Sequence, residues 1–187
     1  MAEPKGDYLA FLGRISPEKR PDHAIAIARR AGLKLKIAAK IDAVDRTYFA
    51  EVIEPLLGEP GIEFVGEIGD CEKSAFLGNS IALLFPIDWP EPFGLVMIEA
   101  MACGTPVVVW RCGAVPEVVD EGMTGFIVTS EDEAVSAVER ASSLDRSEIR
   151  RAFERRFTPK VMARNYLALY WSLAHRSDPD MKVAAAG

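Results

Sequence analysis

Short apolar runs alternate with amphipathic stretches along most of this chain, and no other feature constrains its fold as strongly. Strands that alternate with helices are joined by right-handed crossovers, which produce a parallel sheet covered on both faces. The runs are continuously apolar, as is typical of strands buried on both sides. The sequence therefore predicts an α/β fold with a doubly wound, six-stranded, Rossmann-like parallel sheet, whose strands are residues 8–12, 35–39, 62–66, 81–86, 106–110 and 125–128.

Helices are expected between these strands and after the last one. The predicted helices cover residues 21–32, 47–58, 71–77 and 94–104, followed by three C-terminal helices over 130–144, 147–157 and 158–176. Pro55 should interrupt the second of them, while Ser130 and Thr158 are typical residues to start helices. We interpret residues 1–175 as one domain and 176–187 as a disordered tail.

Composition and charge exclude several classes of protein. A chain of 187 residues suffices for one packed domain. Its net charge of −6 argues against general affinity for nucleic acid. Cys71, Cys103 and Cys112 contain no CxxC pair, which gives no disulfide framework or zinc site. The N-terminus does not resemble a signal peptide, and no apolar run approaches the about 20 residues of a membrane helix. We expect a soluble, cytoplasmic protein.

The loop directly after the first strand is a candidate phosphate site. In the segment GRISPEKRP, Gly13 allows a tight exit from the strand, and Arg14, Lys19 and Arg20 precede the start of a helix. A helix N-terminus carries partial positive charge, and added cations would make a clamp for a diphosphate. A solvated basic loop that pairs with surface acids explains the same pattern equally well.

Two glutamates belong to a second candidate segment. Glu91 lies in the loop after the fourth strand, and Glu99 lies inside an almost wholly apolar helix. A carboxylate in such a helix needs a partner, because burying it alone costs several kcal/mol. The two hydroxyls of a ribose would satisfy Glu99, as an acidic residue does in dinucleotide-binding sheets. An internal salt bridge or partial exposure is the alternative.

The start of that helix offers a backbone cradle. Pro92 stiffens the turn, and Gly94 lets the backbone approach a ligand closely. The N–H groups of Phe93, Gly94 and Leu95 would then face a phosphate, with Glu91 placed to accept hydrogen bonds from a sugar.

A third segment follows the fifth strand. Its small residues Gly113 and Ala114 could let a ligand or a second domain pass, and Glu117 and Asp120 either contact a ligand or belong to a short helix.

Together these segments resemble a known family. Glu91 and Glu99, with seven residues between them in EPFGLVMIEAMACGTPVV, form the E-x7-E signature of the family-4 retaining glycosyltransferases, the glycosyl transferases group 1. GRISPEKRPDHAI resembles the donor-phosphate loop of that family, and PEVVDEGMTGFIV its closing segment. The resemblance covers about residues 8–173 and implies the C-terminal, donor-binding half of a GT-B fold, in which two Rossmann-like domains face each other.

The resemblance implies roles for individual residues. Arg14 and Lys19 correspond to the pair that binds the donor diphosphate, Glu91 to the glutamate near the donor sugar, and Glu99 to the one that holds the ribose. Arg14, Lys19 and Glu91 would be the catalytic groups. The remaining donor contacts would come from Gly13, the backbone of Phe93, Gly94 and Leu95, and, around the base, Gly66, Glu67 and Ile68.

The implied reaction moves a sugar from a nucleoside diphosphate donor to a hydroxyl with retained configuration. The favoured donor is a UDP-sugar, followed by a GDP-sugar. No cofactor or metal is expected, and Asp178-Pro179-Asp180 mimics a DxD metal motif only beyond the last helix. The expected partner is an absent N-terminal, acceptor-binding domain, through which any peripheral membrane contact would run. Without that domain we expect an inactive chain.

Two departures from the family pattern and two alternatives stand beside this interpretation. The family often has Gly directly after the loop lysine, where this chain has Arg20. The larger departure is the expected absence of an N-terminal domain, which leaves the acceptor site and the histidine of that domain without a counterpart. His23 and His175 are expected in helices away from the cleft, at the surface. The alternatives are a truncated, non-catalytic nucleotide-sugar-binding module and half of another GT-B enzyme, such as a starch-type synthase.

Overall fold

A single six-stranded parallel sheet forms the centre of the molecule. The computed structural model describes residues 6–174, and the predicted tail and its DxD-like motif lie outside them. The strand order is β3-β2-β1-β4-β5-β6, and every neighbouring pair is parallel, which confirms the predicted doubly wound α/β sheet. The strands are β1 (Tyr8–Arg14), β2 (Lys34–Lys40), β3 (Ile62–Gly66), β4 (Leu83–Phe85), β5 (Val107–Trp110) and β6 (Gly125–Val128).

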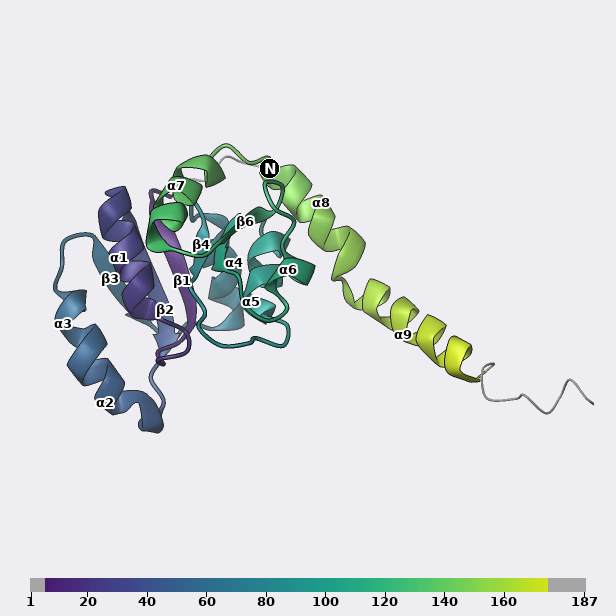
Figure 1. Ribbon diagram of the computed structural model, residues 1–187, viewed down its shortest axis with the longest axis horizontal. Helices are drawn as coiled ribbons and strands as arrows, with labels where there is room; N and C mark the ends of the chain where they lie inside the picture. The colour runs from purple at the N-terminus through teal and green to yellow at the C-terminus, as the bar shows by residue number, and fades with distance from the viewer. Residues whose placement is uncertain (1–5, 175–187) are drawn as a thin grey trace, which may run out of the picture.

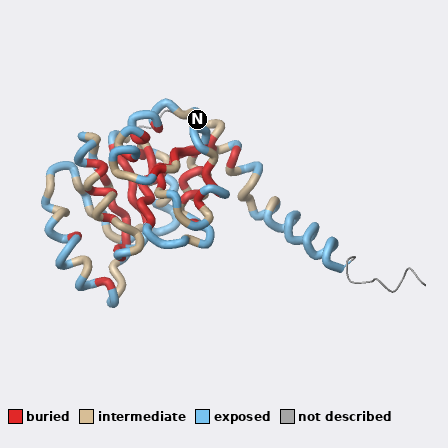
Figure 2. The backbone as a smooth tube through the Cα atoms, viewed as in Figure 1, coloured by how far each residue is buried: buried red, intermediate tan, exposed pale blue. Residues whose placement is uncertain are grey.

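Helices cover both faces of the sheet, so the domain has two hydrophobic cores (Figures 1 and 2). Successive side chains of β1 point to opposite faces. Leu9 and Phe11 pack with α1 (Pro21–Ala31) and α7 (Glu131–Ala141). Ala10 and Leu12 pack with α4 (Asp70–Gly78), α5 (Leu95–Ala102) and α8 (Arg146–Arg156). Burial on both sides explains why the strand sequences are continuously apolar.

The edge strand β3 departs from that pattern. Its residues alternate between half-buried and exposed, with Glu63 and Val65 exposed. An edge strand has a neighbour on one side only and is covered less completely than a central strand. Its sequence IEFVG accordingly contains a charged residue, and Glu63 pairs with Lys36 of β2 at 3.0 Å.

The helix expected to be interrupted by Pro55 is one helical stretch with an irregular middle. A short 3₁₀ turn (Ala43–Asp45) leads into α2 (Arg46–Tyr48), a π-helical turn (Phe49–Ile53) and α3 (Glu54–Leu57). Proline has no N–H, and its ring crowds the carbonyl four residues before it. The wider π-helical turn lies where that crowding occurs, so the helix changes geometry before Pro55 without ending there.

The C-terminal helices differ in how they pack. Helix α8 lies against α5, whereas α9 (Pro159–Ala174) extends away from the body of the domain (Figure 1). No residue of α9 is buried (Figure 2). Large apolar side chains of α9 are exposed, and they include Met162, Tyr166, Leu169 and Tyr170. Within residues 6–174, no helix combines the length and the apolar character that crossing a membrane requires.

Candidate functional site

The candidate site lies at the carboxyl ends of β1 and β4, where the strand order of the sheet reverses. Strands β1 and β4 pair at Ala10 and Leu83, and the pairing does not continue toward their carboxyl ends. Such a switch point leaves a crevice, which is where ligands bind in open α/β sheets. Two cavities of about 420 and 390 Å³ occupy it, and they share Leu12, Gly13 and Val96 as lining residues. A side chain at Gly13 would meet only open space, because no atom lies within 4 Å of the Cβ position.

The smaller cavity brings Lys19 and Glu91 together. Lys19 Nζ lies 2.5 Å from Glu91 Oε2 and 5.2 Å from the centre of the Phe85 ring. The two residues come from the loops after β1 and β4, which the switch point makes neighbours. Neither side chain is fully buried. In the described structure the positive charge of Lys19 is therefore balanced by Glu91, at the position where the sequence predicts a diphosphate.

The segment after β5 packs against the backbone of Glu91. The N–H of Ala114 donates to the Glu91 carbonyl at 2.9 Å. A Cβ on Gly113 would overlap the backbone of Glu91, and the φ of Gly113 is +52°. The small residues at this place thus allow close packing of two loops. Gly113 and Ala114 position Glu91 and leave no passage for a ligand between them and Glu91.

Helix α5 begins at the same cavity without a side-chain cap. Gly94, the residue before the helix, has φ +75° and lines the cavity with Phe93 and Leu95. The Leu95 side chain is exposed, and the Phe93 ring packs edge-on against Phe157 at 6.1 Å between ring centres. Gly94 therefore brings the start of α5 to the wall of this cavity. The phosphate cradle formed by the N–H groups of Phe93, Gly94 and Leu95 stays a prediction.

Arg14 does not join Lys19. Its guanidinium lies 3.4 Å from Asp45, 3.6 Å from Asp42 and 4.0 Å from Glu18, and it lines neither cavity. Asp45 Oδ2 is buried and has no hydrogen-bond partner among the described residues, so Arg14 is the nearest compensation for its charge. Sequence reasoning missed Asp42 and Asp45. Their only signal is their position in the loop after β2, at the functional edge of the sheet.

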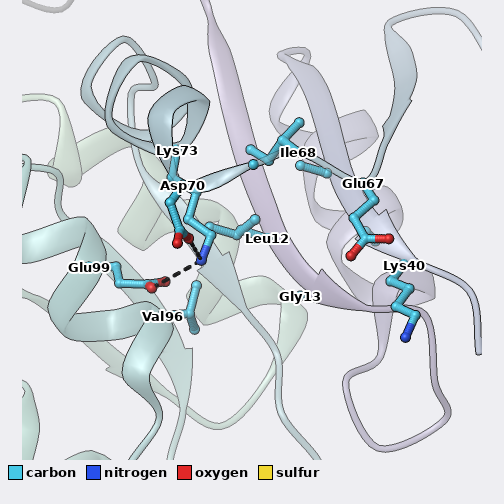
Figure 3. Close-up of a pocket in the computed structure, with 12 residues that line it drawn as sticks. Leu12, Gly13, Lys40, Glu67, Ile68, Asp70, Lys73, Val96 and Glu99 are labelled. Carbon is cyan, nitrogen blue, oxygen red and sulfur yellow. Dashed lines mark hydrogen bonds and ion pairs between the residues drawn. The ribbon is translucent and has the colours of Figure 1, made fainter.

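Glu99 lies in the larger cavity with an unanticipated partner (Figure 3). Lys73 Nζ is 3.3 Å from Glu99 Oε1 and 3.0 Å from Asp70 Oδ1. The hydrogen bond to Asp70 raises the pKa of the Lys73 ammonium, although burial opposes this shift. Glu99 is 38% exposed. The internal salt bridge named as the alternative is therefore present, and the ribose role of Glu99 stays a prediction.

The residues predicted around the base lie at the other end of this cavity. Glu67 and Ile68 line it together with Lys40 (Figure 3). Gly66 ends β3 with φ +77°, a conformation that turns the chain toward the cavity and that suits glycine. Gly66 itself is not a lining residue.

Other candidates have structural roles. Asp120 pairs with Arg156 at 2.8 Å beside the short helix α6 (Val115–Val118), so it stabilises that helix away from the cleft. His23 is half-buried, which corrects its expected place at the surface. Its Nδ1 lies 2.7 Å from Glu131, and its ring lies 5.6 Å from that of Trp110. His175 lies outside the described residues. Between residues 6 and 174, no group of three His, Cys, Asp or Glu side chains could hold a metal ion.

Comparison with known proteins agrees with this geometry. The family model described as glycosyl transferases group 1 matches residues 2–157. D-inositol 3-phosphate glycosyltransferase of Mycobacterium marinum is 30% identical over 142 residues, which cover 69% of this chain and 28% of the relative. Alpha-maltose-1-phosphate synthase of Mycolicibacterium smegmatis is 31% identical over 125 residues, covering 64% of this chain and 32% of the relative.

Solved structures share the fold. AviGT4, a glycosyltransferase involved in avilamycin A biosynthesis, superposes with a TM-score of 0.76 at 29% identity, over 91% of this chain and 52% of that one. Anabaena HepE in complex with UDP and glucose has a TM-score of 0.77 at 22% identity, over 90% of this chain and 49% of that one. The chain thus spans about half of these structures and about a third of the curated relatives. Since the family model covers most of its length, the chain belongs to the glycosyl transferases group 1 family.

Proposed function

We propose that this domain binds the nucleoside diphosphate of a sugar donor for a retaining glycosyltransferase, with UDP-sugars as the first class of donor and GDP-sugars as the second. The diphosphate occupies the smaller cavity beside Lys19 and the start of α5. The ribose and base extend into the larger cavity toward Glu99 and Glu67. The sugar lies beside Glu91, and a hydroxyl of the acceptor receives it.

The observation that carries this proposal is the Lys19–Glu91 pair at the switch point. A partly buried ammonium and a carboxylate at 2.5 Å hold each other in place when no ligand is bound. A diphosphate brings more negative charge than one carboxylate, so it competes for Lys19 and frees Glu91 to accept hydrogen bonds from the sugar. The leaving diphosphate gains charge in the transition state, and Lys19 with the α5 N-terminus stabilises that charge.

Arg14 enters this scheme only after a movement. Its guanidinium faces Asp42 and Asp45, so it must rotate to reach a phosphate beside Lys19. Arginine forms bidentate hydrogen bonds with phosphate, and these are stronger than its long contacts with the two carboxylates. This difference in strength supports a movement of Arg14 from the aspartates to the diphosphate when the donor binds.

The relatives support the choice of donor and leave a second candidate. The structural neighbour HepE is described with UDP and glucose, which favours UDP here. The similarity to an alpha-maltose-1-phosphate synthase favours, as the second candidate, a synthase of that kind that uses the same donor cleft. A truncated module that binds the donor without catalysis shares the cleft as well, and only a transfer assay separates it from the enzyme.

Calorimetric titration with UDP, GDP and ADP tests the proposal. Replacing Lys19 with Ala should weaken binding of the preferred diphosphate about tenfold, because a charge-assisted hydrogen bond is worth about 1.5–3 kcal/mol. Adding Arg14→Ala should weaken it further. The matched control is Lys34→Ala, which removes an exposed lysine at the amino end of β2, the end of the strands that lies opposite the cleft. Equal affinity in the Lys19→Ala and Lys34→Ala variants would contradict the proposed diphosphate site.

A further inference from the structure

Arg20 adopts a backbone conformation that L-residues avoid. Its φ and ψ are 50° and 53°, and no other non-glycine residue among residues 6–174 has a positive φ. Its carbonyl accepts hydrogen bonds from the N–H groups of His23 and Ala24 at the start of α1. Glycine adopts this conformation without a steric cost, whereas arginine does not. A strained residue next to a functional lysine needs an explanation in terms of what its side chain does.

The Arg20 side chain is fully occupied within the protein. Its guanidinium lies 2.9 Å from Asp22 and 3.5 Å from Asp88. The Tyr48 hydroxyl donates a further hydrogen bond to Asp22 at 3.0 Å. Burial alone would raise the pKa of Asp22, but the hydrogen bonds from Arg20 and Tyr48 outweigh it and hold that pKa below its ordinary value. Asp22 therefore stays charged, and Arg20 lines neither of the two cavities.

These contacts tie together two loops that form the cleft. Three links join the loop after β1 to the loop after β4. They are the Lys19–Glu91 ion pair at 2.5 Å, the Arg20–Asp88 pair at 3.5 Å, and the hydrogen bond from the Asp88 N–H to the Glu18 carbonyl at 2.8 Å. The first of these contacts involves the ligand-binding groups themselves and must change when a diphosphate arrives. The other two contacts can persist when the ligand binds, and they hold the two loops in the same relative position.

We propose that Arg20 is a positioning residue, which holds Lys19 at the diphosphate end of the cleft by bridging the α1 N-terminus, through Asp22, to the loop after β4, through Asp88. This inference rests on the proposed function. Arg20 does not touch the donor itself. Its strained backbone directs the guanidinium to both aspartates, and glycine at the same place would relax the backbone but lose the bridge.

The test is a double-mutant cycle with UDP and UMP as ligands. Arg20→Gly preserves the left-handed conformation and removes the bridge, so the domain should unfold at a similar denaturant concentration. If Arg20 acts through Lys19, Arg20→Gly should weaken UDP on the order of fivefold and leave UMP nearly unchanged. In a Lys19→Ala background the same substitution should have little further effect on UDP.

A second variant separates the bridge from the backbone. Asp88→Asn leaves the conformation at residue 20 untouched and removes the negative charge of one partner but keeps an acceptor oxygen, so it should lower UDP affinity less than Arg20→Gly. Equal weakening of UDP and UMP, or losses by Arg20→Gly and Lys19→Ala that simply add, would overturn the positioning role. If the wild-type chain binds no nucleoside diphosphate, the proposed function fails too. If it binds UDP and Arg20→Gly matches it, this inference alone is wrong.

Discussion

At the scale of single residues, three of the charged groups predicted to bind the donor are balanced by other protein groups. Lys19 pairs with Glu91, Glu99 with Lys73, and Arg14 with Asp42 and Asp45. Charges at a partly buried edge without partners would cost several kcal/mol, so the protein without donor satisfies them internally. Donor binding in the proposed function is consequently an exchange of partners. Each new contact with the donor replaces a contact within the protein, so the net gain in binding free energy is smaller than that of the new contact alone.

Sequence reasoning found at least one member of each of these groups and missed Lys73, Asp42 and Asp45. Lys19 and Glu91 were both predicted, because both belong to loops at one edge of the sheet. Lys73, Asp42 and Asp45 carry no motif, and their contacts with Glu99 and Arg14 depend on how loops after different strands pack together. The direction of the Arg14 side chain is likewise decided by those neighbours, which no local pattern in GRISPEKRP contains.

Glu99→Gln tests the ribose role at this scale. If Glu99 accepts hydrogen bonds from both ribose hydroxyls, the variant should weaken UDP about tenfold and 2′-deoxy-UDP only about twofold. A neutral amide has one acceptor oxygen where the carboxylate has two. Calorimetry with both ligands measures the difference.

Glu63→Gln is the matched control for that experiment. Glu63 is a carboxylate on β3 that pairs with Lys36 and lines neither donor cavity. Its replacement should change neither affinity. A Glu99→Gln variant that loses equal affinity for both nucleotides would assign Glu99 a structural role as the partner of Lys73.

At the scale of elements, helix starts were predicted well because their signals are local. The Glu133 N–H donates to Ser130 Oγ at 3.2 Å at the start of α7, and the Met162 N–H donates to the Thr158 carbonyl at the start of α9. Pro21 opens α1 as its first residue. By contrast, the π-helical turn before Pro55 and the alternating exposure of β3 were not predicted. Pro55 predicts an interruption but not the form that it takes, and the exposure of β3 depends on its place at the edge of the sheet.

The start of helix α5 allows a sharp prediction about glycine. Gly94 has φ +75°, and a Cβ there would lie 2.5 Å from Met97 Cε and 3.4 Å from Glu91 Cγ. Gly94→Ala should therefore lower the free energy of unfolding by about 1–3 kcal/mol, from the left-handed backbone and the displaced Met97. UDP affinity should fall as well, because the N–H groups at the start of α5 shift. Urea unfolding and calorimetry measure the two effects.

Gly58→Ala provides the comparison for that substitution. Gly58 follows α3 with φ −75°, and nothing lies within 4 Å of its Cβ position. Alanine fits there, so the variant should be as stable as the wild type or more stable by up to about 1 kcal/mol. Equal free energies of unfolding for the two variants would show that Gly94 is not held in the left-handed conformation in solution.

At the scale of the whole molecule, the alternation of strands and helices determines the class of fold but not the order of strands. A parallel sheet and its two covered faces follow from the pattern of apolar runs. The order β3-β2-β1-β4-β5-β6 depends on which face each helix covers, and this in turn places Lys19 and Glu91 in adjacent loops. The sequence alone does not determine the position of α9, because its apolar side chains could pack on its own domain, stay exposed or form a dimer. Among the described residues it stays exposed.

In the proposed function, the site residues bind the sugar donor, and none of them holds the acceptor. We therefore expect this chain alone to bind a UDP-sugar without transferring its sugar. Lys19, Glu91 and Glu99 all lie at one edge of one sheet, and the cleft opens to solvent opposite them. Transfer requires the acceptor hydroxyl to be held against the sugar carbon, and such positioning supplies about 7–11 kcal/mol of the barrier in favourable cases. Closure must also exclude water, which would otherwise hydrolyse the donor.

An assay with labelled UDP-sugars and pooled hydroxyl acceptors measures this directly, with a full-length member of the family as the positive control. The chain should show saturable donor binding while product formation and donor hydrolysis stay at the background rate. This combination distinguishes an intact donor site without a complete active site from a misfolded domain, which would bind nothing. Transfer by the isolated chain at a rate comparable to the full-length enzyme would mean that the acceptor is positioned by this domain itself. In that case the first candidate for an acceptor site would be the apolar groove beside the donor cleft. This groove lies between Phe93, Leu95 and the exposed side chains of α9.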